Sequence, residues 1–131
     1  MSQEPCAPFD ESLARLPIGV FDSGVGGLTV LDAMRRLMPD ENFLFLGDTA
    51  RVPYGAKSLK TIVRYTSQAA AKLIGQRIKL LVIACNTATS AAIGTLRAAF
   101  SDIPVIGIEP ALKPAAAQHR HVLVLATPLT L

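Results

Sequence analysis

The sequence predicts an α/β fold of the flavodoxin-like, doubly wound type, in which helices flank a parallel sheet on both faces. Short apolar runs alternate along the chain with longer segments whose apolar residues recur at helical spacing. The run at 80–84 lacks polar–apolar alternation, which is typical of a parallel strand covered on both faces. The 131 residues, half of them hydrophobic, are enough for one ordinary domain with a sizeable core.

The elements can be placed in order along the chain. Residues 1–16, which include Cys6, show little apolar periodicity and are predicted to form a flexible N-terminal tail. The first α/β domain is expected to span 17–109. Apolar runs predict strands at 18–21, 43–46, 80–84, 104–108 and 122–126. Helical spacing predicts helices at 28–38, at 59–73, from Cys85 to Phe100, and at 111–118.

Two residues add detail to these helices. Ser58 immediately precedes the helix at 59–73 and is a suitable N-cap residue. Gly94 lies inside the helix that follows Cys85, where glycine costs about 1 kcal/mol relative to alanine. We therefore expect a close packing contact at Gly94.

The stretch from Leu80 to Ser90 is the most informative part of the sequence, because a buried strand ends there in a thiol. Small polar residues follow Cys85 and are suited to capping the start of a helix: Asn86, Thr87, Thr89 and Ser90. Cys85 is therefore expected at the positive end of that helix, where backbone N–H groups and the macrodipole favour a thiolate. A reactive thiol is one interpretation, and a buried structural cysteine is the other.

Four chemistry-bearing residues follow successive predicted strands: Asp22, Asp48, Cys85 and Glu109. In open parallel sheets ligands bind beyond the carboxyl ends of the strands, so together these residues predict a binding site on that edge. Taken singly, Asp22 and Asp48 are equally well explained as helix caps or turn residues.

Two other kinds of site were weighed. A cysteine together with His119 or His121 would suggest a thiol hydrolase, but both histidines precede the predicted strand at 122–126 and so fall at the opposite edge from Cys85. We interpret them as solvated loop residues.

The glycine-rich loop at 22–27 lacks the ending of a P-loop and the spacing of a dinucleotide site, but its N–H groups can bind a carboxylate.

Composition argues against several function classes. The net charge of +3 comes without clustered basic residues and aromatic platforms, which argues against nucleic-acid binding. Two cysteines at unrelated positions form neither a disulfide framework nor a metal-ligand spacing, and they indicate a reducing cytoplasm. No signal sequence and no membrane-length apolar run is recognised, so we expect a soluble, cytoplasmic protein without a membrane partner.

Three separated motifs carry a resemblance to a known family. They lie in the order Gly19–Thr29, Gly47–Gly55 and Ala84–Thr89, and they resemble the glutamate racemases of bacteria, in the aspartate/glutamate racemase family. The resemblance covers about Ile18 to Pro110 and continues weakly over 123–130. It implies an isomerase that interconverts L- and D-glutamate without a cofactor or metal, supplying D-glutamate for peptidoglycan, cell-wall biogenesis and cell shape.

The resemblance also implies roles for individual residues. Cys85 would be one of two catalytic thiols, and Asp22 would take up or orient its proton. The substrate-binding residues would be Asp22, Ser23, Tyr54, Gly55, Asn86, Thr87 and Thr89. Racemisation needs acid/base groups on both faces of the substrate Cα, and two thiols suit this task.

One departure from the family concerns the second thiol, which the family carries in a Cys-Thr-His type motif of a second α/β domain. This sequence has no such motif, so 110–131 would begin an incomplete second domain and the chain alone is expected to be inactive. The full-length form would be a homodimer. Alternatives are a non-catalytic amino-acid or carboxylate-binding fragment and an aspartate-nucleophile phosphohydrolase, although the latter requires a second Asp where this chain has Gly24.

Overall fold

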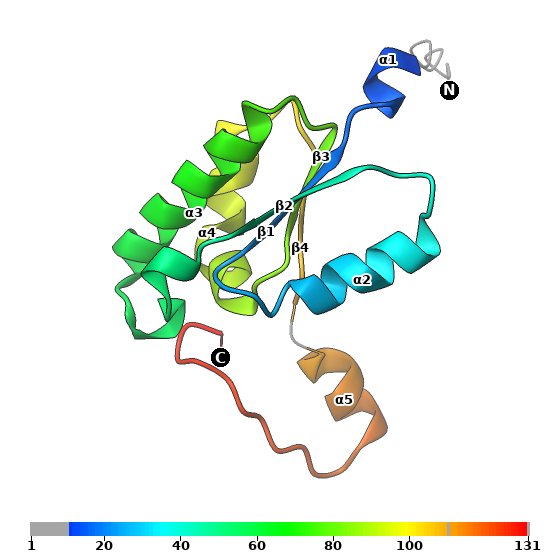
Figure 1. Ribbon diagram of the computed structural model, residues 1–131. Helices are drawn as coiled ribbons and strands as arrows, with labels where there is room; N and C mark the ends of the chain where they lie inside the picture. Colours follow the sequence, from blue (N-terminus) through cyan, green and yellow to red (C-terminus); the bar gives the residue numbers. More distant parts are fainter. Residues whose placement is uncertain (1–10, 110, 131) are drawn as a thin grey trace, which may run out of the picture.

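A four-stranded parallel sheet forms the centre of the computed structural model, which describes residues 11–109 and 111–130 (Figure 1). Its strands are β1 (Ile18–Asp22), β2 (Phe43–Gly47), β3 (Leu80–Ile83) and β4 (Val105–Gly107), in the order β2-β1-β3-β4. The helices are α1 (Glu11–Ala14), α2 (Leu28–Leu37), α3 (Leu59–Ile74), α4 (Asn86–Ala99) and α5 (Leu112–Gln118). Two 3-10 turns follow β2, η1 (Thr49–Arg51) and η2 (Tyr54–Ala56). The predicted α/β fold with a parallel sheet is confirmed.

Helices cover both faces of the sheet, as predicted. Figure 1 shows α3 and α4 together on one side and α2 on the other. Alternate residues of each strand point to opposite faces, so Phe21 and Ile83 pack with α3 and α4, whereas Val20 and Val82 pack with α2. All five residues of β1 are buried, because β1 has a strand on each side and helices above and below.

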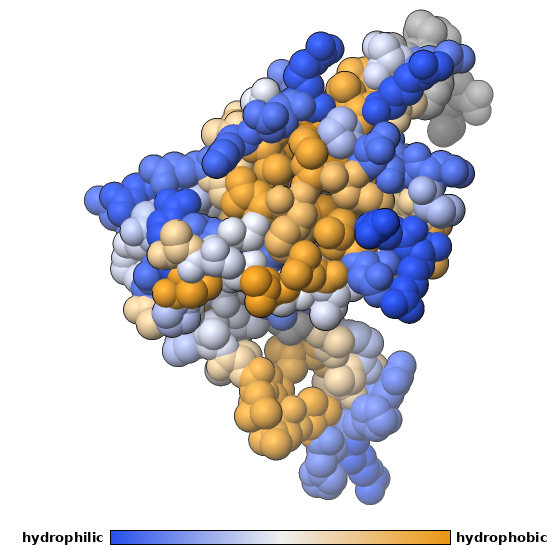
Figure 2. All heavy atoms as spheres, viewed as in Figure 1, coloured by the Kyte–Doolittle hydropathy of each residue, from blue (hydrophilic) through white to orange (hydrophobic). Residues whose placement is uncertain are grey.

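The strand β2 is less protected than β1. It lies at the edge of the sheet, and each of its five residues is only partly buried. In Figure 2, apolar residues gather in the middle of the view, where Figure 1 places the strands between α3 and α2. An edge strand without charged residues, such as β2, leaves apolar side chains and backbone hydrogen-bonding groups accessible.

The predicted strand at 122–126 is wrong. Residues 121–127 have no regular structure, and Leu123 and Leu125 are 86% and 88% exposed. The segment after α5 runs toward the carboxyl ends of the strands, where Thr127 contacts Gly55 and Thr87, and this path takes it away from the β4 edge. The placement of His119 and His121 at the opposite edge depended on that strand. Both histidines are exposed, so their interpretation as solvated residues agrees with the structure.

Part of the predicted N-terminal tail is structured. Residues 11–14 form the one-turn helix α1, and Lys79 Nζ donates to the Ala14 carbonyl and pairs with Glu41. These contacts attach the end of the tail to the body of the protein. Cys6 and the rest of 1–10 lie outside the described residues.

The prediction of a close contact at Gly94 is also wrong. Gly94 is exposed on α4, and a Cβ added there would have no atom within 4 Å. Gly47 is different, since an added Cβ would lie 2.3 Å from the Gly24 carbonyl oxygen, which is backbone and cannot move aside easily. The close approach between β2 and the loop after β1 therefore requires glycine at 47 and leaves 94 free to vary.

These two glycines form a matched pair for a stability test. Gly94→Ala should raise the free energy of unfolding by about 1 kcal/mol, because alanine favours the helix and meets no obstacle. Gly47→Ala should lower it by about 1–3 kcal/mol through overpacking. Urea unfolding of both variants measures the difference, and a Gly47→Ala variant as stable as the parent would contradict the described approach to Gly24.

Candidate functional site

The carboxyl ends of three strands bring the predicted site residues to one edge of the sheet. The Asp48 N–H donates to the Asp22 carbonyl at 3.0 Å, and the Ala84 N–H donates to the Phe21 carbonyl at 2.7 Å. Asp22, Asp48 and Cys85 are each buried at this edge. Glu109, the fourth predicted residue, is exposed and lines a separate cavity of about 650 Å³ beside α4 and α5.

Cys85 is the N-cap residue of α4. Its Sγ accepts from the Ala88 N–H at 3.4 Å and lies 3.1 Å from Ser23 Oγ, and the residue is 8% exposed. The expectation that Asn86, Thr87, Thr89 or Ser90 would cap the helix is therefore wrong, because these residues lie inside α4. The Cys85 sulfur thus accepts a backbone N–H at the start of α4 and shares a hydrogen bond with the Ser23 hydroxyl, in which either side chain can be the donor.

Asp22 has a different local role from the one predicted for proton transfer. Its Oδ2 accepts from the Gly24 N–H at 2.9 Å, which stabilises the turn after β1. The hydrogen-bonding partner of the Cys85 thiol is Ser23, the next residue. The catalytic role predicted for Asp22 stays a prediction.

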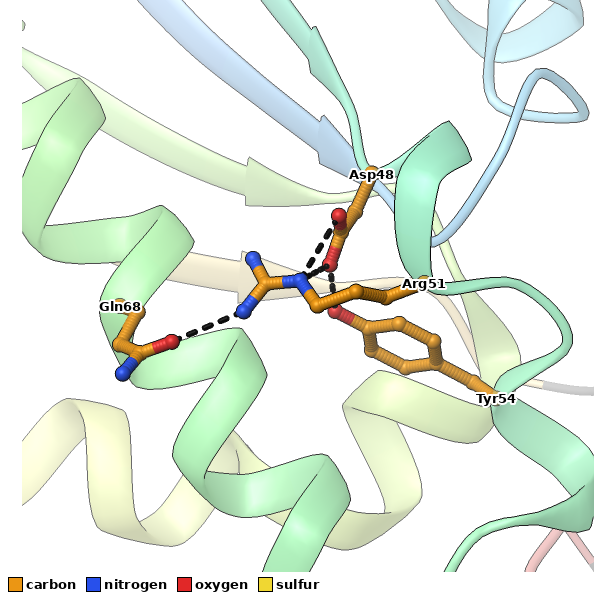
Figure 3. A network of polar contacts seen from close by, with 4 residues as sticks. All are labelled: Asp48, Arg51, Tyr54 and Gln68. Atoms are coloured by element: carbon orange, nitrogen blue, oxygen red, sulfur yellow. Dashed lines mark hydrogen bonds and ion pairs between the residues drawn. The ribbon is translucent and has the colours of Figure 1, made fainter.

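Tyr54 is buried and belongs to a network of polar contacts (Figure 3). Its hydroxyl donates to Asp48 Oδ2 at 2.6 Å. Arg51 Nε donates to the same carboxylate at 2.7 Å from Oδ2, and Arg51 Nη1 donates to Gln68 Oε1 at 2.8 Å. The Arg51 guanidinium also lies over the Tyr65 ring, 4.3 Å from its centroid. The hydroxyl hydrogen of Tyr54 is thus used within the protein.

Electrostatics agree with a buried, neutral phenol at 54. Burial, followed by the hydrogen bond to Asp48 and the charge of Asp48, raises the pKa of Tyr54 far above its ordinary value. The hydrogen bond to Asp48 is also the main reason why the pKa of Arg51 is raised. Both pKa shifts are thus caused in part by the contacts with Asp48.

Three threonine hydroxyls meet beside Gly55. Thr87 Oγ1 lies 3.1 Å from Thr127 Oγ1 and 3.4 Å from Thr130 Oγ1, and the latter two are 2.9 Å apart. A Cβ added to Gly55 would lie 2.6 Å from Thr127 Cγ2, so a larger residue at 55 would require the Thr127 side chain to move. Asn86, the residue before Thr87, is exposed. Asn86 and Thr87 line a small cavity of about 270 Å³ together with 124–127 and Thr130, and Gly55 lies next to Thr127.

The sequence reasoning missed Thr127 and Thr130. A usable signal exists, because an apolar run followed by small polar residues is the same pattern that drew attention to Cys85. Thr89, which was predicted, is buried, and its hydroxyl donates to the Ile83 carbonyl at 3.3 Å. This contact ties α4 to β3, and the substrate-binding role of Thr89 stays a prediction.

Neither a cluster of metal-binding side chains nor a membrane-spanning helix occurs in the described part of the chain. No group of three or more His, Cys, Asp or Glu side chains within 11–109 and 111–130 could hold a metal ion. Over the same residues, no helix is both long enough and apolar enough to cross a membrane.

Comparison with known families and sequences gives a consistent result. The family model described as Asp/Glu/Hydantoin racemase matches residues 18–130. A glutamate racemase of Clostridium novyi (strain NT) is 50% identical over 121 residues, which are 91% of this chain and 47% of the relative. A glutamate racemase of Roseiflexus sp. (strain RS-1) is 52% identical over 117 residues, 88% of this chain and 43% of the relative. The chain spans about half the length of the curated relatives it matches.

Solved structures extend the similarity to the fold. Glutamate racemase from Francisella tularensis in complex with D-glutamate matches with a TM-score of 0.81 and 42% identity, covering 90% of this chain and 45% of that protein. The Thermus thermophilus glutamate racemase in complex with beta-chloro-D-alanine matches with a TM-score of 0.71 and 56% identity, over 77% and 40% of the two chains.

The raised pKa of Tyr54 predicts a pH-dependent stability. A tyrosine that ionises at higher pH when folded stabilises the protein fully below its unfolded pKa of about 10, and this contribution is lost as the pH rises through the folded pKa. The difference in unfolding free energy between the parent and Tyr54→Phe should therefore shrink above about pH 10. Urea unfolding of both proteins at several alkaline pH values measures this difference. Lysines titrate equally in the two proteins, so their contribution cancels. A difference that is constant with pH would contradict the buried neutral phenol.

Proposed function

This chain belongs to the Asp/Glu/Hydantoin racemase family, and we propose that it is the first part of a glutamate racemase that interconverts L- and D-glutamate without a cofactor. The observation that carries the proposal is the position of Cys85 at the start of α4, with Ser23 Oγ 3.1 Å from its sulfur. The D-glutamate bound to the Francisella tularensis relative supports glutamate as the substrate.

The reaction requires one proton to leave Cα and another to arrive on the opposite face. The Cys85 thiolate would take the Cα proton, becoming a thiol, and leave the electron pair on the substrate carbon. A second thiol on the other face would then deliver its own proton to that carbon. Cys85 is the free cysteine among the described residues, and the resemblance to the family implies that the second thiol lies in a second domain, in the part of the relatives that this chain does not span.

The surroundings of Cys85 suit its role as a base. Ser23 Oγ–H and the Ala88 N–H would donate hydrogen bonds to the thiolate, and the start of α4 adds the positive end of its dipole. Asp22, adjacent to Ser23, would take up or orient the proton of Cys85. Donors at Asn86 and Thr87 and the backbone of Tyr54 and Gly55 would hold the substrate carboxylate.

The proposal extends to the setting of the full-length protein. Residues 17–109 would form the first domain, and 110–131 would begin a second domain. The enzyme would act in the cytoplasm as a homodimer, and its D-glutamate would feed peptidoglycan and so cell-wall biogenesis. These statements are supported by the family membership and by the glutamate racemases among the relatives.

A non-catalytic carboxylate-binding role is the second candidate, because the described residues hold one thiol. A binder would leave the Cα hydrogen of glutamate untouched. Exchange of that hydrogen in heavy water therefore separates the two candidates.

We expect the 131-residue chain to exchange the Cα hydrogen of one glutamate enantiomer, slowly and with retention of configuration, because Cys85 can return a proton only to the face from which it came. Cys85→Ser should reduce the rate at least about 100-fold, since a hydroxyl is a far weaker base than a thiolate. NMR of glutamate in heavy water measures the exchange, and chiral chromatography follows configuration. Sustained inversion by the chain alone would refute the two-thiol mechanism.

Racemisation should appear when the second thiol is supplied. We expect it on mixing the chain with the remaining half of the Clostridium novyi glutamate racemase, or on fusing the two. The same fusion with Cys85→Ser serves as the matched control and should be inactive. An active control fusion would show that Cys85 is not one of the two acid/base groups.

A further inference from the structure

We propose that Asp48 is a positioning residue, whose buried carboxylate holds the loop at 48–57 in place through Tyr54 so that Gly55 lies at the candidate site. We call residues 48–57 the Tyr54 loop. The inference rests on the proposed function, because it assigns the Tyr54 loop to the glutamate site. It goes beyond that function because Asp48 would act through Tyr54 and would not contact the substrate itself.

Both oxygens of the Asp48 carboxylate are paired within the protein. Its Oδ2 accepts from the Tyr54 hydroxyl at 2.6 Å and lies 2.7 Å from Arg51 Nε, and its Oδ1 lies 3.0 Å from the same nitrogen. Asp48 is 7% exposed, and its own N–H donates to the Asp22 carbonyl. A buried carboxylate requires such partners, because leaving one unpaired costs several kcal/mol.

Arg51 completes the enclosure of that carboxylate. Figure 3 shows its guanidinium between Asp48 on one side and Gln68 of α3 on the other. The guanidinium also lies over the Tyr65 ring, 4.3 Å from the centroid. With its charge paired to Asp48 and its Nη1 donating to Gln68, Arg51 holds the network together.

The network continues from Tyr54 to the candidate site. The Tyr54 ring packs against the rings of Phe21 and Tyr65, with centroids 6.3 and 6.1 Å away. The next residue, Gly55, lies so close to Thr127 that an added Cβ would be 2.6 Å from Thr127 Cγ2. Thr127 in turn lies 3.1 Å from the Thr87 hydroxyl at the start of α4. A shift of the Tyr54 ring would therefore displace the Gly55 backbone relative to Thr87.

The Tyr54 loop needs a side-chain anchor because its backbone provides few. It contains two 3-10 turns joined through the extended residues Val52 and Pro53. Its own backbone hydrogen bonds run from the Arg51 N–H to the Asp48 carbonyl and from the Lys57 N–H to the Tyr54 carbonyl. The hydrogen bond between Tyr54 and Asp48 spans the junction between the two turns and ties the second turn to the end of β2.

A double-mutant cycle tests the inference in the 131-residue chain. Asp48→Asn and Tyr54→Phe should each weaken glutamate binding about tenfold in calorimetry, and the double variant should bind no more weakly than either single variant. Each should also speed exchange of the Lys57 amide, which reports the Tyr54 loop without any ligand. Asp32→Asn, which breaks the exposed ion pair with Arg36 on α2, is the matched control and should change neither quantity.

A spectroscopic measurement follows the hydrogen bond directly. The chain has two tyrosines and no tryptophan, so in a Tyr65→Phe background the near-ultraviolet absorption reports Tyr54 alone. The phenol should ionise only well above its ordinary pH range, and Asp48→Asn should lower the pKa of Tyr54, since it removes the charge that opposes ionisation. An unchanged titration would overturn the inference.

The binding outcomes separate this inference from the proposed function. Additive losses in the cycle, or a loss with Asp48→Asn alone, would mean that Asp48 contacts the ligand itself, and the inference would be wrong. Wild-type affinity in both single variants would overturn the inference and leave the proposed function intact. If the parent chain does not bind glutamate, the proposed function fails, and Lys57 exchange still decides whether Asp48 holds the Tyr54 loop. If Asp48→Asn does not fold, Tyr54→Phe alone must weaken binding and speed exchange.

Discussion

The parallel pairing of β1 with β2 and β3 is the constraint on which the rest of the structure depends. It places three strand ends at one edge, and backbone hydrogen bonds from Asp48 to Asp22 and from Ala84 to Phe21 continue the pairing just beyond the strands. Motifs separated by about 60 residues are thereby brought within contact distance, as Ser23 and Cys85 demonstrate. Sheet topology therefore determines which side chains meet at the candidate site.

Several polar residues at this edge make hydrogen bonds that stabilise the fold. Asp22 stabilises a turn, Asp48 accepts from Tyr54 and Arg51, and Thr89 ties α4 to β3. The interpretation of Asp22 as a turn residue thus agrees with its hydrogen bond to the Gly24 N–H. The Cys85 sulfur likewise caps α4 and contacts Ser23.

The sequence was sufficient for features that local patterns determine. Unbroken apolar runs such as 80–84 identified the strands, and Ser58 was correctly expected to cap α3, where its side chain accepts from the Thr61 N–H. Three-dimensional packing decided what patterns could not. The run at 122–126 has the composition of a strand but no neighbour to pair with, and Gly94 has the cost of a helix glycine without a packing reason. The hydrogen bond from Tyr54 to Asp48 joins side chains whose orientation no periodicity encodes.

The central position of β1 also has a consequence for synthesis. Of the four described strands, β1 leaves the ribosome before the other three, and one of its two neighbours, β3, is encoded about 60 residues later, as the register of Ile18 with Leu80 shows. At a translation rate of roughly 5–20 residues per second, β1 waits about 3–12 s for that partner. During this interval β1 can pair only with β2, and its apolar residues lack the cover that β3 and α4 later provide. The order of strands in the sheet therefore makes the nascent first half of the sheet dependent on a later part of the same chain.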